Sequence, residues 1–410
     1  MDIQIFELSN GLRVVYKFVP YTRTVHCGYV INAGSRDDLN GEMGMAHFIE
    51  HMIFKGTAKR KTYHILNYLE SVGGEVNAYT TKEKTCLYAS MVAEHFERAT
   101  ELLTDITFNS VFPEKEIVKE KQVISEEIDM YRNSPDEAIF EDFDDLIFPQ
   151  HGLGHPILGT KDSIRDFTKE RVQAHLGRAF IQDQVVFSIV GNVPLRKVQR
   201  IIDKYLAPLE VPSGERILEQ PGRLIQMPTQ EVAIDQDQAH EIMGGRAYAM
   251  RQGNYVPFLI LNNLLGGPAM NTRLNLNIRE KHGLSYNIYS FYIPYQDSGI
   301  WGIYYACERQ NLRRIRRLVQ KELKSLRDNP LGVMRLSQAK KQLIGQLTLS
   351  SESLLSQMLG MAKDMLDFGQ ITPFSTYIEE IEAVSAHDIM DTAHELFPEE
   401  HISRLTYTAS

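Results

Sequence analysis

Two histidines and one glutamate stand close together in the stretch Gly44-Met45-Ala46-His47-Phe48-Ile49-Glu50-His51-Met52. A helix turns about 100° and rises about 1.5 Å per residue, so His47 and His51 lie one above the other on one face, with Glu50 beside them. Two neutral imidazoles at this spacing can bind zinc, and the carboxylate between them can act on a zinc-bound water. The alternative is an ordinary polar helix face without a metal. Other motifs in the chain are needed to distinguish the two interpretations.

A zinc site for hydrolysis needs a third protein ligand and leaves one position for water. The segment 114–132 is predicted to be a helix, because Pro113 stands where proline favours a helix start. Its candidate ligands are Glu120, Glu126, Glu127 and Asp129. Glu120 and Glu127 are seven residues apart and share a face, whereas Glu126 and Asp129 are turned away. Helical geometry leaves both Glu120 and Glu127 open as the ligand, and a charged, solvated helix face is the alternative.

Composition and charge exclude several classes of protein. The chain has 410 residues, of which 43% are hydrophobic and 24% charged, so we expect two or three globular domains. The net charge of −9 argues against a nucleic-acid binder. No apolar run reaches the roughly 18 residues of a membrane span, and the first residues lack the features of a signal peptide. We therefore expect a cytoplasmic protein, unless a leader has been removed, with buried thiols at Cys27, Cys86 and Cys307.

The first half of the chain mixes strands and helices. A hairpin is predicted around Ser9-Asn10-Gly11, because alternating apolar residues flank an Asn-Gly turn. Further strands are expected at 25–33, 76–80, 86–89 and 185–190, and helices at 63–72, 93–108, 114–132, 137–148 and 168–178. The three prolines between residues 206 and 228 indicate a linker.

The second half is predicted to repeat this order of elements. Strands are expected at 284–292, 300–307 and 402–408, and helices at 310–328, 333–366 with an interruption near Ser350-Ser351, and 386–397. The prediction is an α+β protein of two structurally duplicated α/β domains, each a mostly antiparallel sheet packed with helices. Residues 1–210 form the zinc-binding domain, 211–228 the linker and 229–410 the second domain. The second half has no His-x-x-Glu-His, so one metal centre per chain is expected.

Four motifs resemble those of the inverzincin family, which includes pitrilysin, insulin-degrading enzyme and the mitochondrial processing peptidase. They are 44–51 with the following Phe54-Lys55-Gly56-Thr57, then 77–85, 123–128 and 279–286. The resemblance covers both halves in order. It implies that the third zinc ligand is Glu127, 76 residues after His51, and that Glu120 is a carboxylate behind the ligands. It also implies that Arg279 and Tyr286 form the family's Arg and Tyr pair.

The resemblance implies a zinc-dependent endopeptidase. Zinc held by His47, His51 and Glu127 would lower the pKa of its water, and Glu50 would accept the proton. Tyr286 would stabilise the negative charge that develops on the carbonyl, and Arg279 would fix the substrate. A peptide would pair with the edge strand that contains Asn77, Ala78 and Tyr79, so unfolded or extended segments are the expected substrates.

Relatives with four domains in one chain close like a clamshell, and this chain resembles half of one. The expected partner is therefore a second copy: a homodimer in which Arg279 and Tyr286 of one subunit serve the zinc of the other. The alternative function is a non-catalytic peptide-binding or assembly subunit, because some relatives keep the fold without the chemistry. The presence of the three ligands, Glu50 and the Arg and Tyr pair favours the peptidase.

Overall fold

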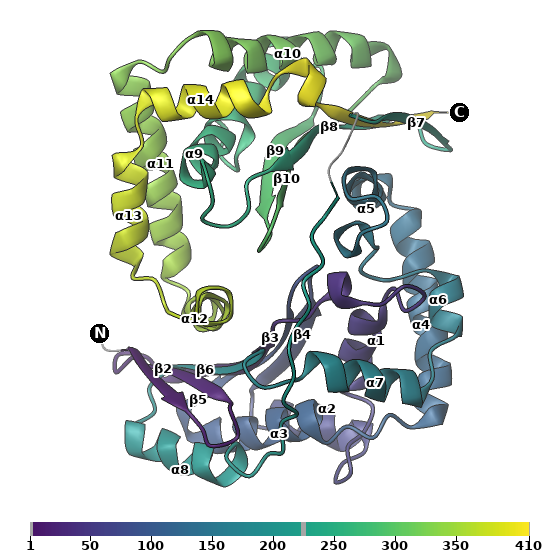
Figure 1. Cartoon of the computed structure of the whole chain (residues 1–410), viewed down its shortest axis with the longest axis vertical. Coiled ribbons are helices and arrows are strands. Elements are labelled where there is room, and N and C mark those ends of the chain that lie inside the picture. Colours follow the sequence, from purple (N-terminus) through teal and green to yellow (C-terminus); the bar gives the residue numbers. More distant parts are fainter. Residues whose placement is uncertain (1–2, 223–226, 410) are drawn as a thin grey trace. The chain divides into compact units, whose positions relative to one another are not determined.

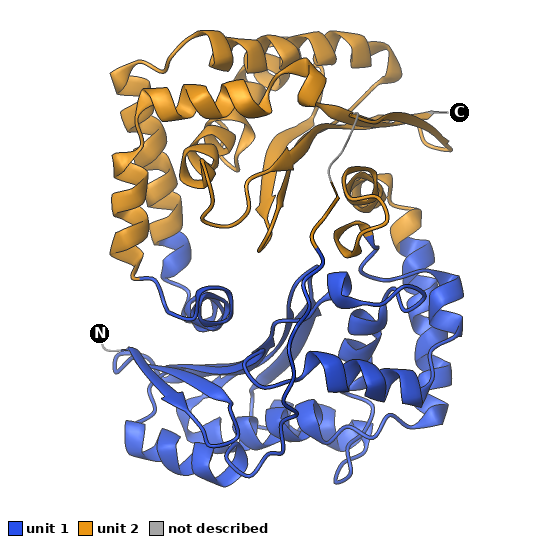
Figure 2. Cartoon of the chain, viewed as in Figure 1, with its two compact units in different colours: residues 1–130, 155–219, 349–372 blue, residues 131–154, 220–348, 373–410 orange. Residues whose placement is uncertain are grey.

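The computed structural model describes residues 3–222 and 227–409, and the chain forms two compact units. Unit 1 contains the chain up to Met130, His155–Glu219 and Leu349–Thr372, whereas unit 2 contains Tyr131–Gly154, Gln220–Thr348 and the chain from Pro373 (Figure 2). Each unit therefore takes one segment from the other half of the sequence. Residues 223–226 of the predicted linker lie outside the described residues, and its described part forms neither helix nor strand.

Unit 1 is built on a sheet that has six strands in the described part of the chain, in the order β1-β2-β6-β3-β5-β4. The strands are β1 (Ile3–Glu7), β2 (Arg13–Phe18), β3 (Thr24–Ile31), β4 (Glu75–Thr80), β5 (Thr85–Val92) and β6 (Val185–Gly191). Only the β2–β6 pair among these is parallel. The hairpin predicted around Asn10-Gly11 is confirmed as β1 and β2, and β4 lies at the sheet edge.

Helices cover both faces of this sheet, which explains why its central strands are apolar throughout. One face carries α1 (Met45–Met52), α2 (Thr62–Glu70), α3 (Phe96–Phe108), α4 (Glu114–Arg132), α7 (Lys169–Ala179) and α8 (Leu195–Tyr205). On β6, Val185, Phe187 and Ile189 pack into this main core. The alternate residues Val186 and Val190 pack on the other face, against α12 (Leu354–Phe368). Helix α12 thus belongs to unit 1, although it lies late in the sequence (Figures 1 and 2).

Unit 2 repeats this plan with a sheet of five strands among the described residues, in the order β7-β11-β8-β10-β9. They are β7 (Thr229–Ile234), β8 (Ala239–Ala247), β9 (Asn287–Pro294), β10 (Gly299–Cys307) and β11 (Ser403–Ala409). Helices α9 (Tyr255–Gly266), α10 (Leu312–Asp328), α11 (Val333–Ser351), α13 (Phe374–Ala383) and α14 (Ala386–Leu396) contribute to the core on one face. Helix α5 (Pro135–Ile147), from the first half of the sequence, packs on the other face through residues such as Phe143 and Ile147.

The predicted duplication is confirmed by the strand order. Leaving out β1, the strands of the two sheets correspond one to one. Among the described strands of each unit, only the pair that joins the first strand to the last is parallel. The interruption expected near Ser350 separates α11 from α12. Strand β9 begins at Asn287 rather than Leu284, because Ser285 turns inward and donates to the carbonyl groups of Asn287 and Ala306. The domain limits 1–210 and 229–410 stay a prediction. These limits assign α5 to the first domain and α12 to the second, whereas the compact units have α5 in unit 2 and α12 in unit 1.

Candidate metal centre

The short helix α1 is fixed at its N-terminus by buried groups. Both carboxylate oxygens of Asp38, which is 5% exposed, accept backbone N–H groups of Gly44, Met45 and Ala46 at 2.8–3.1 Å. This contact satisfies amides that have no partner within a helix and places a negative group at the positive end of the dipole. Gly44 has a φ of 89°, and a Cβ atom there would lie 2.5 Å from the carbonyl oxygen of Leu158. These contacts therefore fix the position at which helix α1 begins.

Three side chains of the predicted site come together in unit 1. One potential ligand atom from each of His47, His51 and Glu127 lies within 4.8 Å of the other two. The two imidazole rings are 4.5 Å apart between centroids, and Nε2 of His51 is 3.8 Å from a carboxylate oxygen of Glu127. Helix α4 brings the glutamate to α1 from 76 residues further along the chain. In residues 3–222 and 227–409, no other group of three histidine, cysteine or acidic side chains meets in this way.

Glu120 lies directly behind His51. Its Oε1 is 2.7 Å from Nδ1 of His51, and its Oε2 is 2.8 Å from Nζ of Lys55. Burial favours the neutral form of both His51 and Glu120. For Glu120, the hydrogen bonds with His51 and Lys55 outweigh burial and lower the pKa of the carboxyl group. For His51, the hydrogen bond with Glu120 and the negative charges of Glu120, Glu127 and Glu50 outweigh burial and raise the pKa of the imidazole. Because Nδ1 of His51 faces Glu120, Nε2 is the nitrogen that faces Glu127. Helical spacing left both glutamates open, and the structure places them on opposite sides of one imidazole.

Burial sets the protonation state of His47. It lowers the pKa of this side chain to about 3, and the neighbouring charge of His51 acts in the same direction. His47 is therefore neutral at ordinary pH, which is the form that binds a metal. Its Nδ1 is buried and has no hydrogen-bond partner among the residues that the structure describes.

Glu50 is half-buried beside these residues and is held by strand β4. The hydroxyl group of Thr80 donates a 2.6 Å hydrogen bond to Oε2 of Glu50. Burial raises the pKa of Glu50, although this hydrogen bond opposes the shift. A carboxylate with a raised pKa suits a group that accepts a proton and returns it.

The predicted peptide-binding residues lie on β4, next to Thr80. Asn77 is exposed, and Ala78 and Tyr79 are half-buried. Strand β4 pairs with β5 on one side only, so its other side presents backbone groups that can pair with an added strand.

The predicted Arg and Tyr pair belongs to unit 2. Arg279 lies in a π-helical segment, Asn275–Glu280, and its guanidinium group is 4.9 Å from the centroid of the Tyr286 ring. Tyr286 is 84% exposed. Both residues line a cavity of about 480 Å³ together with residues from α9 and β9. The structure thus brings the two residues together within their own unit.

The sequence-based prediction assigns no supporting contact to Asp38, Lys55 or Thr80, although Lys55 and Thr80 stand in two of the motifs that carry the resemblance. Lys55 follows His51 by four residues, which is a recognisable helical spacing. Thr80 follows Ala78 by two residues and therefore lies on the same face of the strand. Asp38 reaches the helix from outside it, and no local pattern in the sequence indicates this contact.

The donor set fits a zinc ion. Two imidazoles and one carboxylate are the ligands of several catalytic zinc sites, and such sites keep one position for water. A histidine ligand usually donates its second ring nitrogen to a carboxylate, and Glu120 provides that partner for His51. With Nδ1 of His51 held by Glu120, Nε2 is the nitrogen that would bind the ion.

Comparison with known proteins identifies the family of the chain. Residues 13–161 match the family model of insulinase (peptidase family M16), and residues 166–343 match the peptidase M16 inactive domain. A protein of Bacillus subtilis described as the uncharacterized zinc protease YmxG is 33% identical over 399 residues, which cover 97% of both chains. A Rickettsia felis protein, also described as an uncharacterized zinc protease, is 31% identical over 398 residues, 97% of this chain and 95% of its own.

Solved structures show the same fold. A peptidase M16 inactive domain from Pseudomonas fluorescens has a TM-score of 0.91 at 18% identity and covers 100% of this chain and 99% of its own. A protease from Helicobacter pylori gives 0.91 at 19% identity, with 99% of both chains covered. The family models and the relatives described as zinc proteases support a zinc metallopeptidase. The chain belongs to the insulinase family of peptidases, family M16.

Proposed function

We propose that the protein is a zinc-dependent endopeptidase that hydrolyses unfolded peptides or extended segments of polypeptides. One zinc ion per chain would be held by His47, His51 and Glu127. The observation that carries the proposal is the meeting of these three side chains next to Glu50, whose carboxylate is tied to the edge strand β4. Metal ligands, a base and a surface for backbone pairing thus lie within one unit.

Each side chain of the site would have its own role in peptide hydrolysis. Zinc, when bound, would supply Lewis acidity, which makes a water more acidic and polarises a peptide carbonyl. Glu50 takes the proton from the attacking water and delivers it to the leaving amine. Thr80 orients the Glu50 carboxylate, and Glu120 orients the ring of His51.

Strand β4 accounts for the kind of substrate. A peptide that pairs with β4 as an added strand is recognised through backbone hydrogen bonds, which depend little on its side chains. Such pairing needs an extended segment. Folded proteins are therefore poor substrates, and flexible segments of varied sequence are good ones.

The active form would be a homodimer in which Arg279 and Tyr286 of one subunit complete the site of the other. The high exposure of Tyr286 supports this arrangement, because its hydroxyl group is available to a partner or a substrate. Mixing a His47→Ala chain with a Tyr286→Phe chain should restore one complete site per heterodimer. If two inactive variants recover no activity although they form heterodimers, the arrangement in trans is wrong.

The test of the function compares wild type with Glu50→Gln, using a quenched fluorescent peptide and metal analysis. Glutamine keeps the shape of the side chain but accepts no proton, so the variant should bind zinc as wild type does and lose turnover. The second candidate is a non-catalytic peptide-binding or assembly subunit, which would bind peptide without turnover in either protein.

Location in the cytoplasm stays a prediction. Among the described residues, no helix combines the length and the apolar character that a membrane span requires.

A further inference from the structure

The turn that joins β4 to β5 is built from charged residues that are buried. Lys82, Glu83 and Lys84 are each only 5–6% exposed, although lysine and glutamate in a turn usually face water. The turn is closed by Thr81, whose backbone N–H donates to the carbonyl of Lys84 at 2.8 Å and whose hydroxyl oxygen accepts the N–H of Lys84 at 3.0 Å. The turn directly follows Thr80, whose hydroxyl group donates a hydrogen bond to Glu50.

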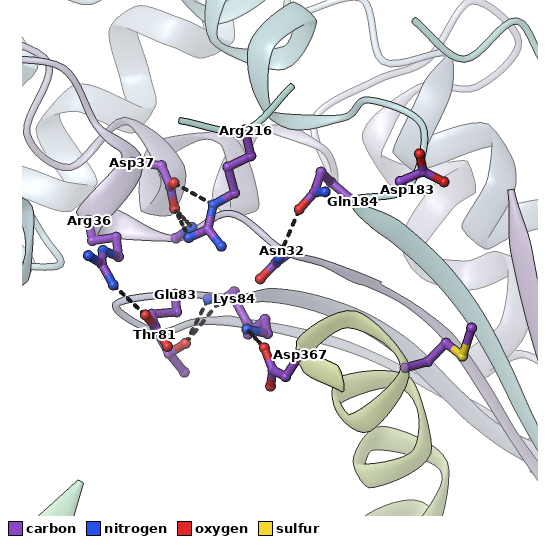
Figure 3. A network of polar contacts seen from close by, with 12 residues as sticks. Asn32, Arg36, Asp37, Thr81, Glu83, Lys84, Asp183, Gln184, Arg216 and Asp367 are labelled. Atoms are coloured by element: carbon purple, nitrogen blue, oxygen red, sulfur yellow. Dashed lines mark hydrogen bonds and ion pairs between the residues drawn. The ribbon is translucent and has the colours of Figure 1, made fainter. Parts of the chain in front are cut away.

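The backbone after β3 supports one side of this turn. The N–H groups of Ser35 and Arg36 donate to the carbonyl groups of Thr81 and Lys82 at 3.1 and 2.8 Å. A Cβ atom on Gly34 would lie 2.2 Å from the carbonyl oxygen of Thr81, so only glycine permits this approach. The guanidinium group of Arg36 then pairs with Glu83 at 2.5 Å (Figure 3).

Helix α12 supports the other side. Nζ of Lys84 is 2.6 Å from Oδ1 of Asp367, and the two side chains are only 6% and 7% exposed (Figure 3). Asp367 stands in the last turn of α12, where the helix dipole disfavours a negative charge. The helix itself therefore gives no reason for an acidic residue at this place, whereas the buried ammonium group of Lys84 does. Removing Asp367 takes this compensating charge away from the buried ammonium group of Lys84.

Helix α12 also contacts β4 one turn earlier. Nζ of Lys363 lies 5.5 Å from the centroid of the Tyr79 ring. Lys363 and Asp367 are four residues apart and share a face of α12. The same face therefore holds both the final part of the edge strand and the turn that follows it.

We propose that Asp367 is a positioning residue for peptide hydrolysis: through Lys84 it fixes the β4–β5 turn, and with it the edge that pairs with the substrate and the Thr80 hydroxyl that orients Glu50. This inference rests on the proposed peptidase function. It assigns a role in the site to a residue 240 positions after Glu127, on a helix that the second half of the sequence contributes.

The test measures peptide hydrolysis and hydrogen exchange of the β4 amides in Asp367→Asn and Lys84→Met. A loosened edge strand has to be ordered when the peptide binds and holds Thr80 less firmly against Glu50, so kcat/KM should fall about tenfold or more, through a higher KM and a lower kcat. Zinc content should stay that of wild type, and residues 76–80 should exchange faster. The double variant Lys84→Asp with Asp367→Lys rebuilds the pair in reverse and should regain most of the lost activity.

The control is Asp105→Asn, which weakens another buried ion pair of unit 1, that of Asp105 on α3 with Arg60. It should lower the melting temperature without faster exchange in β4. Wild-type KM together with wild-type exchange of β4 in folded Asp367→Asn would overturn the inference, as would a reversed pair that stays as impaired as the single variants. If wild type shows no turnover, the proposed function fails, while the exchange data still decide whether Asp367 positions β4.

Discussion

The hydroxyl group of Thr80 donates a 2.6 Å hydrogen bond to Oε2 of Glu50, so the edge strand and the base are directly connected. In Thr80→Val the carboxylate loses this donor while the shape of the residue is kept. We expect kcat to fall by about tenfold, because the base is no longer held in one orientation. Steady-state kinetics with a quenched peptide measures the effect.

Thr80→Ser is the matched control, since it keeps the hydroxyl group and should keep most of the activity. Zinc content should equal that of wild type in both variants. Equal kcat for the valine and serine variants would show that the hydrogen bond does not orient the base.

Glu120 should control zinc affinity, because it holds Nδ1 of His51 and is itself held by Lys55. In Glu120→Gln the charge that supports the imidazole is lost. Zinc affinity should fall by about 10- to 100-fold, measured by competition with a chromogenic chelator. Glu126→Gln, on the same helix but at a position that the helical spacing turns away from the site, should bind zinc as wild type does; a similar loss there would point to the net charge of α4 instead.

Acid should destabilise unit 1 through His175, which is buried 3.8 Å from Asp38. Burial, assisted by the charge of Arg178, lowers the pKa of His175 to about 4, whereas an unfolded histidine titrates near 6.5. Between these values the unfolded chain binds a proton that the folded chain does not, so stability is complete above about pH 6.5 and decreases as the pH falls. The loss attributable to this residue is about 3 kcal/mol by pH 4.

The measurement is the free energy of unfolding in urea at several pH values between 7 and 4. His175→Gln cannot gain this proton, so its stability should fall less steeply than that of wild type over the same range. Parallel pH profiles of the two proteins would contradict the assignment.

Helix α12 should stabilise unit 1 although it lies late in the sequence. Met358 is fully buried in the core between α12 and the sheet. Met358→Ala should lower the free energy of unfolding by about 2–5 kcal/mol. Leu349→Ala, at a residue that is 77% exposed, should change it by less than about 0.5 kcal/mol. Similar stabilities of the two variants would show that α12 is not part of this core.

Much of the architecture could be predicted because it depends on local patterns. The Asn-Gly hairpin, the positions of α3, α4, α10 and α11, and the repeated order of strands follow from periodicity and turn residues. Strand β8 and helix α9 were not predicted. Strand β8 ends in Gly244-Gly245-Arg246-Ala247, which lacks the usual alternation, and α9 is buried around most of its surface and so shows no polar stripe.

The exchange of α5 and α12 between the units could not be predicted for a different reason. An amphipathic helix shows in its sequence which face is buried, but not which sheet covers that face. The site shows the same limit. Helical spacing predicted that His47, Glu50 and His51 lie together, and it reduced the candidates for the third ligand to Glu120 and Glu127. The contacts of Asp38 and Asp367 join segments that are far apart in the sequence, and no local sequence pattern indicates that such segments meet.

The most direct test of the account is an anomalous difference map, recorded at the zinc absorption edge from crystals of protein that hydrolyses peptide. We expect one strong peak per chain, in contact with the imidazole nitrogens of His47 and His51 and a carboxylate oxygen of Glu127. Active crystals that show no peak at these three residues, or whose only peak lies elsewhere, would contradict it.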